Sequence, residues 1–199
     1  MRIFVIAIII IFNLQAWTKA NEIKDFEIEG MSIGDSLLDY AKQRTINNSR
    51  KYYYKSDKFY TIDLVLDSFK TYYAVQVHLE KDDPKFKIFG LGGAIIFGEP
   101  GVYFPESVDK CKKQLNIIEK DLDKIFPKAD KQRDSITGQE DYDPEVIRNE
   151  VYFILDDGDI YLQCSTWSKE FKEKEYLFDS LRLTMMNIEF SNWINNEAY

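Results

Sequence analysis

The chain is short of the residues from which most catalytic and metal sites are built. Its 199 residues include one histidine, His78, and two cysteines, Cys111 and Cys164. One imidazole and two distant cysteines do not form the closely spaced ligand set of a zinc site. The acidic residues 156–159 lack the spaced ligands and distal glutamate of a calcium loop. The glycines of 90–93 have no following lysine, as a phosphate loop requires. The sequence therefore predicts no metal site and no cofactor site.

Basic residues are also in the minority, with 26 Lys and Arg against 34 Asp and Glu and a formal net charge of −8. An acidic surface repels the phosphates of nucleic acids and the headgroups of anionic lipids, so neither is an expected partner. Long apolar runs are absent after the first residues. Because a membrane-spanning helix needs about 20 apolar residues, no such helix is predicted after the first apolar segment.

The first twenty residues have the pattern of a secretory signal peptide. A positive start at Arg2 precedes an unbroken apolar core, residues 3–12, and the small residues Thr18 and Ala20 mark a cleavage site after Ala20. The alternative is an uncleaved anchor, for which this core is short. Cleavage removes two basic residues and no acidic one, so the net charge becomes −10. We expect a periplasmic or secreted single domain, residues 21–199.

Cys111 and Cys164 both lie in the mature chain. An even number of cysteines in an oxidising compartment favours a disulfide between them. Two buried reduced thiols remain the alternative, because spacing alone does not show that the residues meet. A bond would close a loop of 53 residues, which the chain-entropy treatment values at roughly 4 kcal/mol.

Two segments have helical spacing. Residues 106–126 carry an apolar stripe at intervals of three and four, with charged residues on the other faces and Pro127 at the end. A shorter helix is expected to begin at Asp35 or Ser36. Apolar residues in period two, separated by turn residues, predict strands, and these are expected in residues 26–29, 58–66, 71–80, 85–97, 151–155, 160–167 and 178–190. Residues 128–144 are expected to form a long exposed loop, and residues 169–174 a charged link.

Together these elements predict an α+β fold, because the strands follow one another in hairpins and do not alternate with helices. We expect an antiparallel sheet of about six strands with two helices on one face, joined to the sheet by the Cys111–Cys164 bond. The order helix, strand, strand, strand occurs twice, which suggests half-units at residues 26–97 and 102–190.

Two overlapping strings near the start of the mature chain carry the sharpest functional hypothesis. Residues 30–34 read Gly-x-Ser-x-Gly and residues 34–37 read Gly-Asp-Ser-Leu. The second string resembles the first block of the GDSL-type lipases and esterases, which implies that Ser36 is a nucleophile. That family also has a Gly-x-Asn-Asp block, a C-terminal Asp-x-x-His and a parallel sheet. Neither string occurs here, and His78, expected on the exposed face of its strand, follows Val75 where the family has aspartate.

The same residues have a structural interpretation. Gly30 and Gly34 allow the chain to turn, Ser32 or Ser36 can cap the next helix, and Asp35 suits the positive end of that helix. A serine without a base is a weak nucleophile. We therefore assign no catalytic residue and favour the capping interpretation, with a serine esterase that uses Ser36, or else Ser32, as the alternative.

Residues 29–40 also resemble the opening of a family of small, exported, uncharacterised bacterial proteins, which implies export but no functional residue. Aromatic side chains make up 15% of the chain. They can line a binding surface or pack in the core, and the candidates are Tyr52, Tyr53, Tyr54, Tyr72, Tyr103, Tyr142, Trp167 and Trp193. We predict an exported, non-enzymatic domain that binds a ligand or protein partner through an aromatic, acidic surface.

Overall fold

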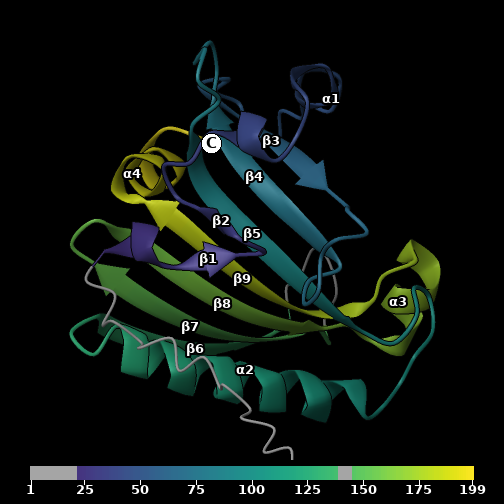
Figure 1. Cartoon of the computed structure of the whole chain (residues 1–199). Helices are drawn as coiled ribbons and strands as arrows, with labels where there is room; N and C mark the ends of the chain where they lie inside the picture. Colours follow the sequence, from purple (N-terminus) through teal and green to yellow (C-terminus); the bar gives the residue numbers. More distant parts are fainter. Residues whose placement is uncertain (1–21, 139–144) are drawn as a thin grey trace, which may run out of the picture.

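A computed structural model describes residues 22–138 and 145–199 of the chain (Figure 1). The predicted signal peptide, residues 1–20, and the acidic residues 140–143 lie outside the described residues. The strands are β1 (Glu27–Ile28), β2 (Met31–Ser32), β3 (Phe59–Leu64), β4 (Ala74–Glu80), β5 (Ile88–Phe97), β6 (Asp130–Thr137), β7 (Ile147–Leu155), β8 (Gly158–Thr166) and β9 (Asp179–Asn187). The helices are η1 (Ile23–Asp25), η2 (Leu37–Asp39), α1 (Gln43–Asn48), α2 (Ser107–Ile125), α3 (Lys169–Glu175) and α4 (Ile188–Asn196).

The fold is α+β, as predicted, and its centre is a seven-stranded antiparallel sheet in the order β3-β4-β5-β9-β8-β7-β6. Strands β1 and β2 form a separate small hairpin. The predicted hairpins are confirmed, since β3 pairs with β4, β4 with β5, and β7 with β8. The last strand, β9, lies between β5 and β8 and joins two meanders into one sheet. That long-range pairing has no local signal in the sequence.

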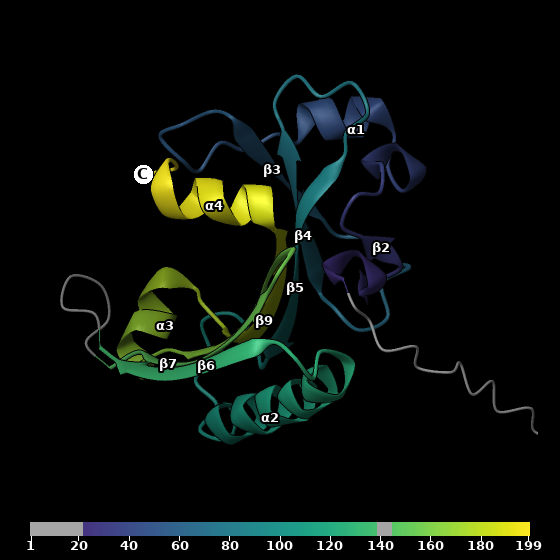
Figure 2. The same cartoon turned by 90° about the vertical axis from the view of Figure 1, so that its left-hand side faces the viewer.

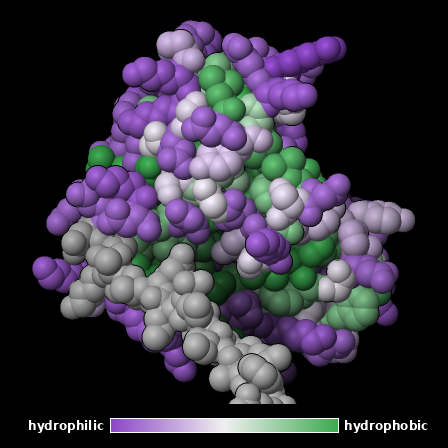
Figure 3. Space-filling model, in the orientation of Figure 1, coloured by the Kyte–Doolittle hydropathy of each residue, from purple (hydrophilic) through white to green (hydrophobic). Residues whose placement is uncertain are grey.

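The main hydrophobic core lies on the face of the sheet that α2 covers. Its members include Ile62, Val77 and Leu91 from neighbouring strands and Cys111 and Leu115 from α2. The β1–β2 hairpin, η2 and α1 add side chains to the same core, so both predicted helical segments pack on one face. Figure 3 shows apolar surface between the β1–β2 hairpin and α2 on this side of the molecule. No described helix is long and apolar enough to span a bilayer.

A second, smaller core lies on the opposite face, where Figure 2 shows α3 and α4. It consists mainly of aromatic residues from the sheet and α4, namely Phe59, Phe89, Phe190, Trp193 and Ala198. Helix α4 contacts the same central strands, β5, β8 and β9, that α2 contacts from the other side. The centre of the sheet is therefore covered on both faces, and α3 and α4 are additions to the predicted fold.

Three segments differ from the prediction. Residues 130–137, predicted as loop, form the edge strand β6, whose side chains are all exposed and which pairs only with β7. With neither face buried, this strand has no apolar alternation to detect. The predicted charged link forms helix α3. The predicted final strand ends at Asn187, whose side chain accepts a hydrogen bond from the Phe190 backbone N–H at 2.8 Å and caps α4. The change of apolar phase interpreted as a bulge is the change from strand to helix.

Candidate functional site

The Gly-x-Ser-x-Gly segment forms part of the main core. Glu29 and Gly30, at φ 52° and 80°, make the two-residue turn between β1 and β2. Met31, Ile33 and Leu37 are buried in the main core. After β2 the chain runs beside the start of β5, where the Gly34 N–H donates to the Ile88 carbonyl at 2.9 Å and the Leu37 N–H donates to the Phe86 carbonyl at 2.9 Å. The motif therefore anchors the N-terminal segment to the sheet.

Both motif serines bond to backbone groups. Ser36 is the N-cap of η2: its Oγ accepts from the Leu38 N–H at 3.3 Å and donates to the Lys85 carbonyl at 2.7 Å. The Ser32 hydroxyl donates to the Phe26 carbonyl at 3.4 Å. Within residues 22–138 and 145–199, neither hydroxyl is hydrogen-bonded to an imidazole, an ammonium or a carboxylate. The capping role expected of Ser36 is confirmed.

His78 is buried, and its expected position on an exposed face is wrong. Only 6% of the residue is accessible, because α4 covers this part of the sheet. The ring stacks on Phe190 with centroids 4.7 Å apart, and its Nδ1 lies 3.0 Å from the Thr61 hydroxyl. Burial, and then the positive charge of Arg182, lower the pKa of His78 to about 4. The imidazole is therefore neutral at pH 7 and has a structural partner.

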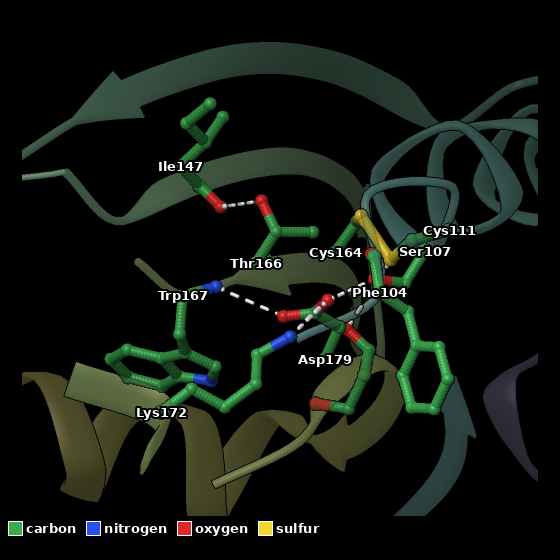
Figure 4. A network of polar contacts seen from close by, with 10 residues as sticks. Phe104, Ser107, Cys111, Ile147, Cys164, Thr166, Trp167, Lys172 and Asp179 are labelled. Atoms are coloured by element: carbon green, nitrogen blue, oxygen red, sulfur yellow. Dashed lines mark hydrogen bonds and ion pairs between the residues drawn. A yellow bond between two sulfur atoms is a disulfide. The ribbon is translucent and has the colours of Figure 1, made fainter. Parts of the chain in front are cut away.

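The predicted disulfide between Cys111 and Cys164 is confirmed, with Cα atoms 5.9 Å apart (Figure 4). Beside it lies a buried ion pair between Lys172 Nζ and Asp179 Oδ2, 2.7 Å apart, with both side chains at most 2% exposed. The other Asp179 oxygen accepts from the Trp167 N–H at 3.0 Å, and the Ser107 hydroxyl also bonds to Asp179. Because both carboxylate oxygens are occupied, this network fixes α3 and the start of α2 to the sheet and offers no free group to a ligand.

Helices α3 and α4 lie on the other face of the sheet (Figure 2). A band of polar side chains crosses that face. Two adjacent cross-strand rows form the band. We call it the polar band, and its residues are Asp63, Gln76, Gly92, Thr184, Tyr161 and Tyr152 in one row and Ala74, Ala94, Arg182, Gln163 and Glu150 in the next. The polar side chains of these rows range from the buried Glu150 to the exposed Arg182. They follow one another across six strands, and this makes the face a candidate binding surface.

The centre of the polar band is hollowed. A depression of about 50 Å³ is lined by Asp63, Ala74, Gln76, Gly92, Ala94 and Arg182. The residues between the two charges are small, and a Cβ added at Gly92 would lie 3.4 Å from the Thr184 hydroxyl and 3.6 Å from Gln76 Cβ. A larger residue at Gly92 would therefore occupy the hollow. Arg182 is exposed and forms no hydrogen bond or ion pair with any residue the structure describes.

The acidic groups of the polar band are held by neighbouring donors. Asp63 accepts from Lys51 Nζ at 2.5 Å and from Gln76 Nε2 at 3.0 Å. Burial raises the pKa of Asp63, but these two donors outweigh it and the pKa is lowered. Glu150 accepts from the hydroxyls of Tyr161 and Tyr152 at 2.7 and 3.1 Å. Both carboxylates are fixed in position, whereas the guanidinium between them is free to bind.

Aromatic groups lie on both sides of the depression. On one side the Tyr53 hydroxyl is 3.5 Å from Asp63 Oδ2, and the rings of Tyr54 and Tyr199 are 5.6 Å apart. On the other side Tyr152 and Tyr161 stack with centroids 4.6 Å apart. The other aromatic candidates divide between surface and core. Tyr52 and Tyr103 are exposed, Trp167 is half-buried and stacks on Phe171, and Tyr72 and Trp193 pack against the cores, whereas Tyr142 lies outside the described residues.

The sequence did not single out Arg182, Gln163 or Glu150. Alternation assigns Gln163 and Arg182 to the outward face of their strands, whereas Glu150 precedes the predicted strand, residues 151–155. Nothing local shows that the outward faces of six strands align. In the described part of the chain, no group of three or more His, Cys, Asp or Glu residues is placed to hold a metal ion. No protein-family model, no curated protein and no solved structure matches this chain.

Proposed function

We propose that the protein is an exported, non-enzymatic binding domain that holds a segment of a polypeptide partner on its polar band. The observation that carries the proposal is the depression between Asp63 and Arg182, in which a fixed carboxylate faces an unpaired guanidinium across a floor of small residues. Exposed, unpaired arginine is the side chain most suited to bind carbonyl and carboxylate oxygens.

A polypeptide fits this arrangement because a peptide group has a carbonyl oxygen on one side and an N–H on the other. Arg182 can donate to the oxygen while Asp63 accepts from the N–H. The Gln163 amide nitrogen already donates to Glu150 and Tyr161, and that of Gln76 donates once, to Asp63. Gln163 can therefore offer its carbonyl oxygen as an acceptor, whereas Gln76 and Thr184 can each donate and accept along the band. The depression is large enough for one such group, and the rest of the partner would lie across the exposed surface.

The tyrosines on both sides of the depression support a protein partner. Tyrosine gives a large contact area at a low entropic cost and is enriched at protein interfaces. Export is a separate part of the proposal, supported by the pattern of residues 1–20 and by the Cys111–Cys164 bond, which suits an oxidising compartment.

The alternative function, a serine esterase, has less support. Its nucleophile, Ser36, donates its proton to a backbone carbonyl and caps a helical turn. Labelling of the purified protein with a fluorophosphonate probe tests this alternative directly. Labelling that is lost in Ser36→Ala and retained in Ser32→Ala would replace the binding proposal with the enzymatic one.

The binding proposal is tested on arrays of defined peptides and glycans, with wild type and Arg182→Ala compared. Arg44→Ala is the matched control, because Arg44 is exposed on α1, on the other face of the sheet. We expect a subset of peptides to bind wild type and the control equally, and Arg182→Ala at least about tenfold more weakly, as loss of a charged hydrogen bond implies. Binding to glycans alone, or peptide binding that survives Arg182→Ala, would contradict the proposal.

A further inference from the structure

A second cleft lies on the opposite side of the sheet from the polar band, between α2 and the strands β6 and β7. Its volume is about 640 Å³, and its lining residues are Lys112, Leu115, Asn116, Arg133, Asp134, Ser135 and Asn149. Small-molecule sites in proteins occupy about 300 to 1,000 Å³. The cleft is therefore large enough for a small ligand, and its chemistry differs from that of the polar band.

The charged residues that line this cleft are two cations, Lys112 and Arg133, and one acid, Asp134. Lys112 is half-buried on α2 and has no hydrogen bond or ion pair with any described residue. Arg133 uses one nitrogen, Nη2, for Asn116 Oδ1 at 2.7 Å and for Glu119 at 3.1 Å, which leaves its other donors available. Glu119 is also paired with Lys131. The Asp134 carboxylate accepts from the Ser135 N–H. Asp134 is in register with Glu150, which belongs to the polar band, so its side chain is directed to the other face of the sheet.

Asn149 adds an unused donor. Its Oδ1 accepts from the Ser135 hydroxyl at 3.4 Å, while its Nδ2 is buried and has no hydrogen-bond partner. Buried amide groups are nearly always hydrogen-bonded, and each exception needs an explanation. Asn149 lies in register with Cys164 of β8, so the disulfide holds the floor of the cleft to α2. Asn149 also lines the cleft, so a bound ligand would hydrogen-bond to Nδ2 only with the amide rotated about the Cβ–Cγ bond.

We propose that this cleft binds a small molecule through an oxyanion group, a phosphate or a carboxylate, held by Lys112, Arg133 and Asn149. Three donors from α2, β6 and β7 match the several acceptor oxygens of such a group. The net charge of the chain is −8, so general attraction does not draw anions to the surface. Binding must therefore arise from the local set of donors. Because none of these donors belongs to the polar band, the proposal does not depend on the polypeptide site.

The test is an NMR titration of the full mature protein labelled with ¹⁵N. Inorganic phosphate and acetate are the two probes, each at constant ionic strength set with sodium chloride so that screening does not change. We expect saturable shifts of the Asn149 side-chain amide and the Arg133 Nε–H signals with at least one probe, and the probe that binds more tightly identifies the oxyanion.

Two variants separate a specific site from general charge. Lys112→Gln should weaken binding about tenfold, as removal of one charged donor implies. Lys113→Gln makes the same charge change at the next, exposed residue of α2 and should leave binding unchanged. Absence of saturation with both probes, or equal weakening in the two variants, would overturn the proposal. Arg182→Ala should not alter this titration, so failure here is distinct from failure of the polypeptide site.

Discussion

The buried imidazole of His78 should make the protein less stable at mildly acidic pH. The pKa of a histidine in an unfolded chain is 6.5, and burial lowers that of His78 to about 4 in the fold. Between these values the unfolded chain binds a proton that the folded protein does not bind. The free energy of unfolding therefore falls as the pH falls through this window, levels off below pH 4, and has no contribution from His78 above pH 7.

The size of the effect follows from the two pKa values. Their difference, multiplied by 1.36 kcal/mol per pH unit, gives about 3 kcal/mol, which is a large share of the stability of a single domain. Carboxylates titrate in the same range, so the histidine must be isolated. His78→Gln is the matched variant, because glutamine can still bond to the Thr61 hydroxyl but has no proton to gain.

Urea denaturation of wild type and His78→Gln at pH 7 and pH 4 measures the difference. Between pH 7 and pH 4, we expect the free energy of unfolding to fall by about 3 kcal/mol more in wild type than in the variant. Because the chain has one histidine, the imidazole signals in an NMR titration belong to His78 alone. A midpoint near 6.5 in the folded protein, or equal losses in both proteins, would refute the reasoning and would mean that α4 does not seal the ring from water.

Three further changes test the contacts that hold the fold. Removal of the disulfide by Cys111→Ser with Cys164→Ser should lower the free energy of unfolding by about 4 kcal/mol, and an unchanged urea midpoint would contradict this. Asp179→Asn leaves the ammonium of Lys172 buried without its counter-ion and should cost about 3 to 5 kcal/mol, part of which Lys172→Met in the same chain should restore. Gly34→Ala should lower the free energy of unfolding by about 1 to 2 kcal/mol, because φ is 97° at this residue. No atom lies within 4 Å of the added Cβ, so the loss comes from the backbone alone, and thermal unfolding measures it.

Local patterns were sufficient for much of the fold. The alternation in residues 58–66 and 71–80 predicts the β3–β4 hairpin because one face of each strand is buried in the main core. The stripe of residues 106–126 predicts α2 for the same reason. The two cysteines predict their bond because they are an even number in a chain that is expected to be exported. The cap at Ser36 is equally local, since it depends on backbone groups within a few residues.

The remaining features depend on contacts between distant segments. Strand β6 carries no pattern because neither of its faces is buried. His78 is predicted to be exposed because the helix that covers it, α4, is more than a hundred residues away in the sequence. Arg182 reads as an ordinary outward residue, and only the pairing of β9 with β5 places it beside Asp63 across the hollow. Sequence periodicity indicates which face of a strand is buried in the core. Which element covers the other face depends on how strands far apart in the chain align.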